Sequence, residues 1–403
     1  NVKYWENSIK DNFFGNINID LFGRLGFRKF ENNAAYIPTP LNILSLGTFF
    51  SNRYQKVVNA SQDSDVVNHE VGHAILDRIR SNYIDSKYHL EGAAIHEAFS
   101  DINAFLMAAM EENIETPNSL DNPNVFSSIG EYFGKIIYTE REIEKEILDK
   151  NPFVDIKQIE VNKPIRDLSG KVEYVPYNSL PDNKKGEHSY SLPLSTTFYK
   201  AFASYAKEVG DVKKAAQEFF KIFTYGTILS PVSPTTMPDF YKSFIVADIL
   251  YNDSKLSSYL LLAAKESNLL NDSIEKIKEE IHQSKNVQLQ KFKEFILNIQ
   301  GKSKDKLDNG LIAKLILEDL RKQFPQFNYI KELKVNIVPS IDGIQIEGIY
   351  TYPAKINDEI DVYGGILLVF DKNMELVYSK IEIPSFEKIS VVSDYYSLKN
   401  PKK

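Results

Sequence analysis

The pattern with the clearest chemical meaning lies at residues 69–73, which read His-Glu-Val-Gly-His. On a helix, side chains four residues apart lie on the same face, so His69 and His73 point in the same direction and Glu70 flanks them. Two imidazoles at this spacing can supply two ligands to a zinc ion, and the carboxylate can act as a base beside it. The segment therefore predicts half of a metal site on one helix.

The next helical segment contains the residue types that are still missing. Glu97 can be the third ligand, and Asp101, one turn later, can orient a ligand imidazole. Three protein ligands leave the fourth tetrahedral position to water, as in catalytic zinc sites. We therefore expect a zinc peptidase in which a zinc-bound water attacks the peptide carbonyl, with Glu70 as general base.

The composition is that of an ordinary globular protein. The 403 residues are 43% hydrophobic and 26% charged, with a net charge of -7 and no cysteine. There is no basic footprint for nucleic acid, and we expect no nucleic-acid partner. No apolar run approaches the roughly 20 residues of a membrane helix, so no membrane span is expected. Disulfides and thiolate ligands are excluded.

The elements that position the site follow from hydrophobic periodicity. Residues 1 to about 60 mix short apolar runs with Asn and Gly, which predicts strands and turns. Capping residues at 63–65 precede a helix expected at 66–80, and a second helix is expected at 91–110. Residues 111–190 are expected to be irregular, apart from a charged helical piece near 140–150. Further helices are expected at 192–208, 211–223, 238–251, 255–267 and, as one long charged helix, 271–300.

The C-terminal quarter reads as a separate module. A polar break at 301–305 precedes a helix at 308–323, and strands are expected at 331–338, 344–352, 365–370 and 375–383. We divide the chain into an N-terminal α/β lobe with the active-site helix (1–80), a mainly helical catalytic lobe (81–270), a helical connector (271–304) and an α+β accessory module (305–403). The module could serve substrate docking, surface attachment or inhibition, or could only stabilise the protein.

Over about residues 1–270 the sequence resembles the thermolysin family of zinc metalloendopeptidases. The family signature Gly-Ala-x-Asn-Glu-Ala-x-Ser-Asp is matched at 93–101 by Ala-Ala-Ile-His-Glu-Ala-Phe-Ser-Asp. His96 stands where the family usually has Asn, and we expect it to face away from the metal. The resemblance implies an α+β fold with two lobes, the second mainly helical, here followed by the small C-terminal α+β module. It also implies Zn²⁺, protein or peptide substrates, and a secreted or otherwise extracytoplasmic location.

The resemblance assigns catalytic roles to residues outside the ligand set. Tyr88, nine residues before Glu97, is implied to bind the substrate carbonyl. His188, in the segment Glu-His-Ser-Tyr-Ser at 187–191, is implied to donate to the oxyanion, with Asp182 as its orienting carboxylate. The alternative for His188 is a solvated loop histidine.

Substrate-binding residues are implied as well. Asn33 and Ala34 are similar to the family's edge strand, which holds an extended peptide. Arg166, in Ile-Arg-Asp-Leu-Ser, is implied to grip a carbonyl on the primed side, although it could be a plain surface arginine. An apolar pocket on the primed side would favour a substrate with a bulky apolar residue there. The alternative is that the residues expected to line this pocket are ordinary core residues. Those residues are Val66, Ile129 and Ile165.

Calcium is a weaker expectation than zinc. Ala108 and Ser128 stand where the family has acids, and only Asp65 and Glu131 remain. A cage of about six to eight oxygen ligands needs several carboxylates.

Three alternatives to an endopeptidase stay open. The five-residue pattern arises by chance in roughly 1% of chains of this length, and the Glu-x-x-x-Asp companion makes chance agreement rarer. A non-catalytic relative could keep the fold and bind only metal or peptide. An aminopeptidase could use the same ligands, but we find no acidic motif to capture a free amine.

Overall fold

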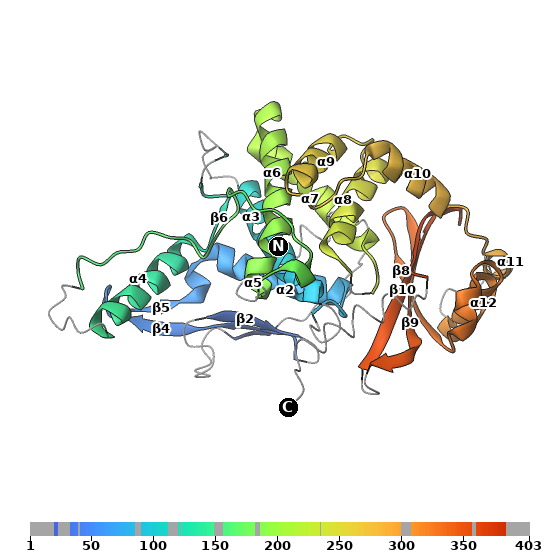
Figure 1. The fold of residues 1–403 in the computed structure, drawn as a ribbon, viewed down its shortest axis with the longest axis horizontal. Helices are drawn as coiled ribbons and strands as arrows, with labels where there is room; N and C mark the ends of the chain where they lie inside the picture. Colours follow the sequence, from blue (N-terminus) through green and yellow to red (C-terminus); the bar gives the residue numbers. More distant parts are fainter. Residues whose placement is uncertain are drawn as a thin grey trace.

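The computed structural model shows an α+β protein, which confirms the expected fold class at this level (Figure 1). The structure describes residues 20–22, 33–38, 41–84, 90–111, 120–121, 123–148, 156–181, 186–233, 235–299, 308–356 and 360–383. Within these ranges, no helix combines the length and the apolar character that a membrane crossing requires. Tyr88 and Asp182 lie outside the described residues.

Short strands occupy the N-terminal part, as expected. A three-stranded sheet has the order β1-β3-β2, with β1 parallel and β2 antiparallel to β3, so β2 is at one edge. Tyr36 of β2 donates a hydrogen bond of 2.8 Å to the Asp77 carboxylate on the next helix, which ties the edge strand to that helix. The strands are β1 (Asp20–Phe22), β2 (Ala34–Ile37), β3 (Ile43–Leu46) and the hairpin of β4 (Thr48–Ser51) and β5 (Lys56–Asn59).

The helix that carries the His pair, α2 (Ser64–Ile79), begins at a cap that the sequence indicated. Asp63 accepts hydrogen bonds through Oδ1 from the first-turn amides, and through Oδ2 from the Phe133 amide at 2.9 Å. Phe133 is in the first turn of α4 (Glu131–Leu148), so one carboxylate caps two helices. The expectation of only a short helical piece near 140–150 was wrong, because α4 begins nine residues earlier at this shared cap.

The second site helix, α3 (Leu90–Met110), packs directly on α2. A Cβ added at Gly72 of α2 would lie 2.7 Å from the Ser100 Cα of α3. Since real Cβ atoms do not approach that closely, only glycine allows the two helices this separation.

Four longer helices and one short helix complete the main core. The helix expected at 211–223 ends later than predicted, because α7 continues six residues beyond 223. Thr224 and Thr227 donate their hydroxyls to the Phe220 and Phe223 carbonyls and remain buried in the helix. The helices are α5 (Glu187–Tyr190), α6 (Leu192–Val209), α7 (Val212–Leu229), α8 (Met237–Tyr251) and α9 (Ser257–Glu266).

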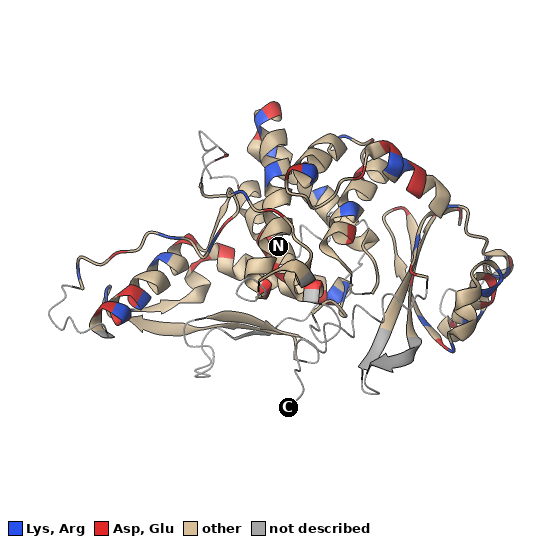
Figure 2. Ribbon diagram, viewed as in Figure 1, with Lys and Arg blue, Asp and Glu red and all other residues tan. Residues whose placement is uncertain are grey.

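The single helix expected at 271–300 is two helices, α10 (Ile274–Ser284) and α11 (Gln290–Ile299). The helix breaks at 285–289 because the two apolar stripes are buried in different places. Ile277 and Ile281 join the main core, whereas Phe292 and Ile296 join a second core with α12 (Asn309–Gln323). Acidic and basic residues are interspersed on the outer faces of α4, α10 and α12 (Figure 2).

The C-terminal sheet is covered on both faces. Its order is β11-β10-β9-β8, all antiparallel, and it lies between the main helical body and the α11–α12 pair (Figure 1). Alternate β10 residues face opposite sides: Leu367 and Val369 join the main core, and Leu368 joins the second core, which starts at Leu289. Helix α11, which we assigned to the connector, therefore packs with the module. The strands are β8 (Leu333–Pro339), β9 (Gly343–Ile356), β10 (Ile360–Asp371) and β11 (Leu376–Ile381).

Arg80, the C-cap of α2, joins the metal-site helix to this sheet. Its side chain is fully buried, and Nη1 lies 2.8 Å from Glu347 Oε1 on β9. The guanidinium also donates to the Ile228 and Ser230 carbonyls at the end of α7. The end of α2, the end of α7 and the C-terminal sheet therefore meet at one buried charge.

Candidate metal centre

His69 and His73 of α2 converge with Glu97 of α3. The two histidine Nε2 atoms are 3.1 Å apart, and Glu97 oxygens lie 3.3 Å from His69 Nε2 and 3.5 Å from His73 Nε2. Tetrahedral bonds of about 2.0–2.1 Å place neighbouring ligand atoms about 3.3 Å apart. Across the part of the chain that the structure describes, this is the only cluster of three or more His, Cys, Asp or Glu residues suited to a metal ion. The buried group could bind a metal ion.

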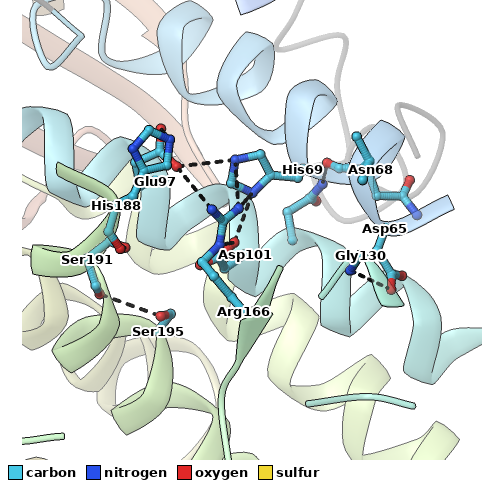
Figure 3. Close-up of polar contacts among 12 residues, drawn as sticks. Asp65, Asn68, His69, Glu97, Asp101, Gly130, Arg166, His188, Ser191 and Ser195 are labelled. Atoms are coloured by element: carbon cyan, nitrogen blue, oxygen red, sulfur yellow. Dashed lines mark hydrogen bonds and ion pairs between the residues drawn. The ribbon is translucent and has the colours of Figure 1, made fainter. Parts of the chain in front are cut away.

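The outer nitrogen of His69 faces a carboxylate, as Asp101 was expected to provide. His69 Nδ1 lies 2.9 Å from Asp101 Oδ1, and the Asp101 side chain is fully buried. A proton held on Nδ1 by this carboxylate leaves the Nε2 lone pair free for a metal. Figure 3 shows this arrangement, with Asp101 below the His69 ring.

Arg166 enters the same site from β7 (Arg166–Asp167), which pairs with β6 (Ser128–Ile129). Its Nε donates to Asp101 Oδ1 at 2.7 Å, and Nη2 lies 3.0 Å from His69 Nδ1 (Figure 3). Burial would lower the pKa of Arg166, but Asp101, Glu97 and Glu70 outweigh it and raise the pKa. Arg166 is thus a partly buried cation held by the acids of the site. Its contact with substrate stays a prediction.

The charges in the site favour a carboxylate ligand that stays ionised. Burial alone would raise the pKa of Glu97, but His73 and His69 outweigh it and lower the pKa well below its usual range. Glu97 Oε2 is buried and accepts no hydrogen bond from the described residues, so it is available to a cation. For His69, burial and Arg166 favour the neutral ring, but Asp101 and Glu97 raise the pKa to about 9.

Glu70 and His188, the proposed base and oxyanion donor, both lie on helices that carry or adjoin the ligands. Glu70 is buried on α2, close enough to Arg166 for its charge to raise the pKa of that residue. His188 is on α5, and its Nε2 lies 3.5 Å from Glu97 Oε1 while 64% of its side chain is exposed (Figure 3). The structure therefore places His188 beside the ligand Glu97, and Glu70 next to the ligand His69 along α2.

Glu91 is a site residue that sequence reasoning missed. Its buried carboxylate accepts hydrogen bonds from Tyr174 and Tyr190 hydroxyls, both at 2.9 Å, and from the Met237 amide at 2.7 Å. Burial raises the pKa of Glu91, although these three hydrogen bonds oppose the rise. Tyr190 follows His188 by two residues, so Glu91 fixes the helix that carries His188. An acid in the first turn of a helix was the available signal.

His96 is a second residue whose importance the sequence did not reveal. It is buried, and its Nδ1 lies 3.0 Å from His73 Nδ1. Burial, with a contribution from His73, lowers the pKa of His96 well below its usual value. His96 is not a member of the three-residue ligand group.

The implied substrate-binding residues lie on the strand and core around α2. Asn33 is exposed just before β2, its carbonyl accepts from the Gly47 amide at 2.9 Å, and Ala34 is buried opposite Leu46. The three implied pocket residues are divided between cores: Val66 and Ile165 belong to one apolar cluster and Ile129 to the main core.

Asp65, one of the two acids that remain at the implied calcium position, has a partner within the protein and a raised pKa. Asp65 Oδ2 accepts a hydrogen bond of 3.3 Å from the Gly130 amide (Figure 3). Burial and the nearby Asp63 carboxylate raise the pKa of Asp65 to about 7, and Glu131 adds to the rise.

No family model matches this sequence, and no curated protein is detectably similar to it.

Proposed function

We propose that this protein is a zinc-dependent endopeptidase with a thermolysin-like arrangement of the site. One observation carries the proposal: His69 Nε2, His73 Nε2 and the two Glu97 carboxylate oxygens have separations close to those of a tetrahedral ligand set. Asp101 lies at the outer nitrogen of His69 and orients that ligand. Glu70, on the same helix as His69, provides the base that hydrolysis of a peptide bond requires.

A zinc ion bound by these three side chains would supply a Lewis acid for a peptide carbonyl and for a water molecule. Glu70 takes a proton from the attacking water on its carboxylate and passes it to the amine nitrogen of the leaving group. His188 donates from its ring to the carbonyl oxygen as negative charge develops there. Arg166 keeps Asp101 in place, and Asp101 in turn fixes the His69 ring.

The substrate in this proposal is an extended polypeptide. The edge position of β2 offers backbone groups on its unpaired side, within the described sheet, to which a peptide can add as a further strand. We further propose a bulky apolar residue on the primed side, because Val66 and Ile165 share one apolar cluster beside α2 and Arg166. A location outside the cytoplasm is proposed from the family resemblance alone.

Glu70→Gln tests the catalytic proposal. It keeps the size of the side chain and removes its ability to accept a proton, so hydrolysis of casein and of quenched peptides should fall about 10²–10⁴-fold. Zinc content, measured by elemental analysis, should equal that of the parent. Equal hydrolysis by both proteins would contradict the mechanism, and zinc binding without hydrolysis by either would indicate a non-catalytic metal protein.

A further inference from the structure

His96 packs against the metal-ligand His73 from the neighbouring helix. The two ring planes are inclined by only 20°, with centroids 5.3 Å apart and Nδ1 atoms 3.0 Å apart, so the rings meet edge to edge. His96 is only 2% exposed. This contact lies on the opposite side of the His73 ring from Nε2, the atom that faces His69 and Glu97.

The distance between the two Nδ1 atoms requires one donor and one acceptor. If His73 binds a metal through Nε2, that nitrogen carries no proton, so the proton of the neutral ring is on Nδ1. His73 Nδ1 then donates, and His96 Nδ1 accepts. His96 must therefore carry its own proton on Nε2. This step rests on the proposed function, because it uses His73 as a metal ligand.

The surroundings of His96 Nε2 do not explain why a histidine occupies this position. That nitrogen is buried, and no hydrogen-bond partner for it is found among the described residues. A buried ring N–H without an acceptor is unfavourable, so packing alone does not account for an imidazole at this position. The useful contact of the ring is the one that Nδ1 makes with His73.

We propose that His96 is a positioning residue that fixes the tautomer and the ring orientation of His73, as Asp101 does for His69. The two ligand histidines then have different outer partners, a carboxylate for His69 and an imidazole for His73. Outer partners of ligand histidines set metal affinity, and their loss typically weakens it about 10–100-fold.

Two substitutions of the full chain separate hydrogen bonding from packing. His96→Phe keeps a ring against His73 but removes the acceptor, so zinc affinity, measured by competition with a chromophoric chelator, should fall about 10–100-fold. His96→Asn removes the ring but restores an acceptor through its amide oxygen, so affinity should stay near that of the parent. Parent affinity in His96→Phe, or equal losses in both variants, would overturn the proposal.

A spectroscopic measurement reads the tautomers directly. In protein with ¹⁵N-labelled histidine, long-range ¹H–¹⁵N spectra should show His73 protonated on Nδ1 and His96 protonated on Nε2, with six histidines to assign. A proton on His96 Nδ1 would overturn the proposal. The spectra are recorded on zinc-loaded protein, because only metal binding at Nε2 holds the His73 proton on Nδ1. The zinc site itself fails if His69→Ala binds zinc as tightly as the parent.

Discussion

Gly72→Ala tests whether the close approach of α2 and α3 sets the metal geometry. The added Cβ would lie 2.7 Å from the Ser100 Cα, and ordinary contact begins at 3.4 Å. The obstacle is backbone, so the helices must separate by about 0.7 Å or the chain must distort locally. Because the histidines are on one helix and Glu97 is on the other, this separation widens the ligand set directly.

The expected losses follow from these distances. The Glu97 oxygens already lie 3.3 and 3.5 Å from the two histidine nitrogens, near the tetrahedral separation of about 3.3 Å. A shift of this size can lower catalytic rate by on the order of 10²-fold, and overpacking costs about 1–3 kcal/mol of stability. Zinc affinity, peptide hydrolysis and the urea unfolding of the metal-free protein measure the three effects.

Gly170→Ala is the matched control, because a Cβ there meets nothing within 4 Å. It should leave zinc affinity and hydrolysis unchanged. The reasoning is refuted if Gly72→Ala keeps parent zinc affinity and gains the stability of about 0.5–1 kcal/mol that alanine normally brings to a helix.

Three further predictions concern the surroundings of the site. Glu347→Ala leaves the buried Arg80 charge without its carboxylate and should lower the free energy of unfolding by about 3 kcal/mol, measured in urea. Tyr190→Phe should reduce peptide hydrolysis in the parent but not in a His188→Ala background, because the Tyr190 hydroxyl acts by holding the helix of His188. Asp65 has a folded pKa of about 7, above its unfolded value of 3.8, so its contribution to stability is present at pH 4 and lost as the pH rises through 7. The free energy of unfolding of Asp65→Asn, relative to that of the parent, should therefore rise by up to about 4 kcal/mol between pH 4 and pH 8. Unfolding measured at each pH tests this.

Each of these predictions has a control or a contrary outcome. Glu375→Ala breaks an exposed ion pair with Lys293 and should change stability by less than about 1 kcal/mol. Additive losses from Tyr190→Phe and His188→Ala would show that Tyr190 acts elsewhere. A stability difference for Asp65→Asn that is independent of pH would show that this carboxyl does not titrate near 7.

Local signals in the sequence predicted the elements that bear the ligands. Asp63 marks the start of α2 because an N-cap acts within three residues, and the spacing of His69 and His73 is a property of one helix. Glu97 was reachable by the same reasoning, because a second helical segment with suitable acids follows closely. The α+β class was implied by the family resemblance, and hydrophobic periodicity separately predicted strands in the first 60 residues and helices after them.

The features that the sequence did not reveal depend on contacts between distant residues. The break between α10 and α11 depends on which core each apolar stripe meets, and periodicity within either helix does not contain that information. The contact of His96 with His73 depends on how α3 is rotated against α2. Glu91 looks like an ordinary first-turn acid until Tyr174 and Tyr190 are brought to it from more than 80 residues away.

The contact between Arg80 and Glu347 has a consequence for biosynthesis, because 267 positions separate the two residues. At about 5–20 residues per second, roughly 13–50 s of translation pass after α2 is made before its buried arginine can meet its counter-charge. We expect nascent chains that stop before residue 343 to hold zinc poorly. The proposed peptidase activity would then be absent from the growing polypeptide until β9 emerges.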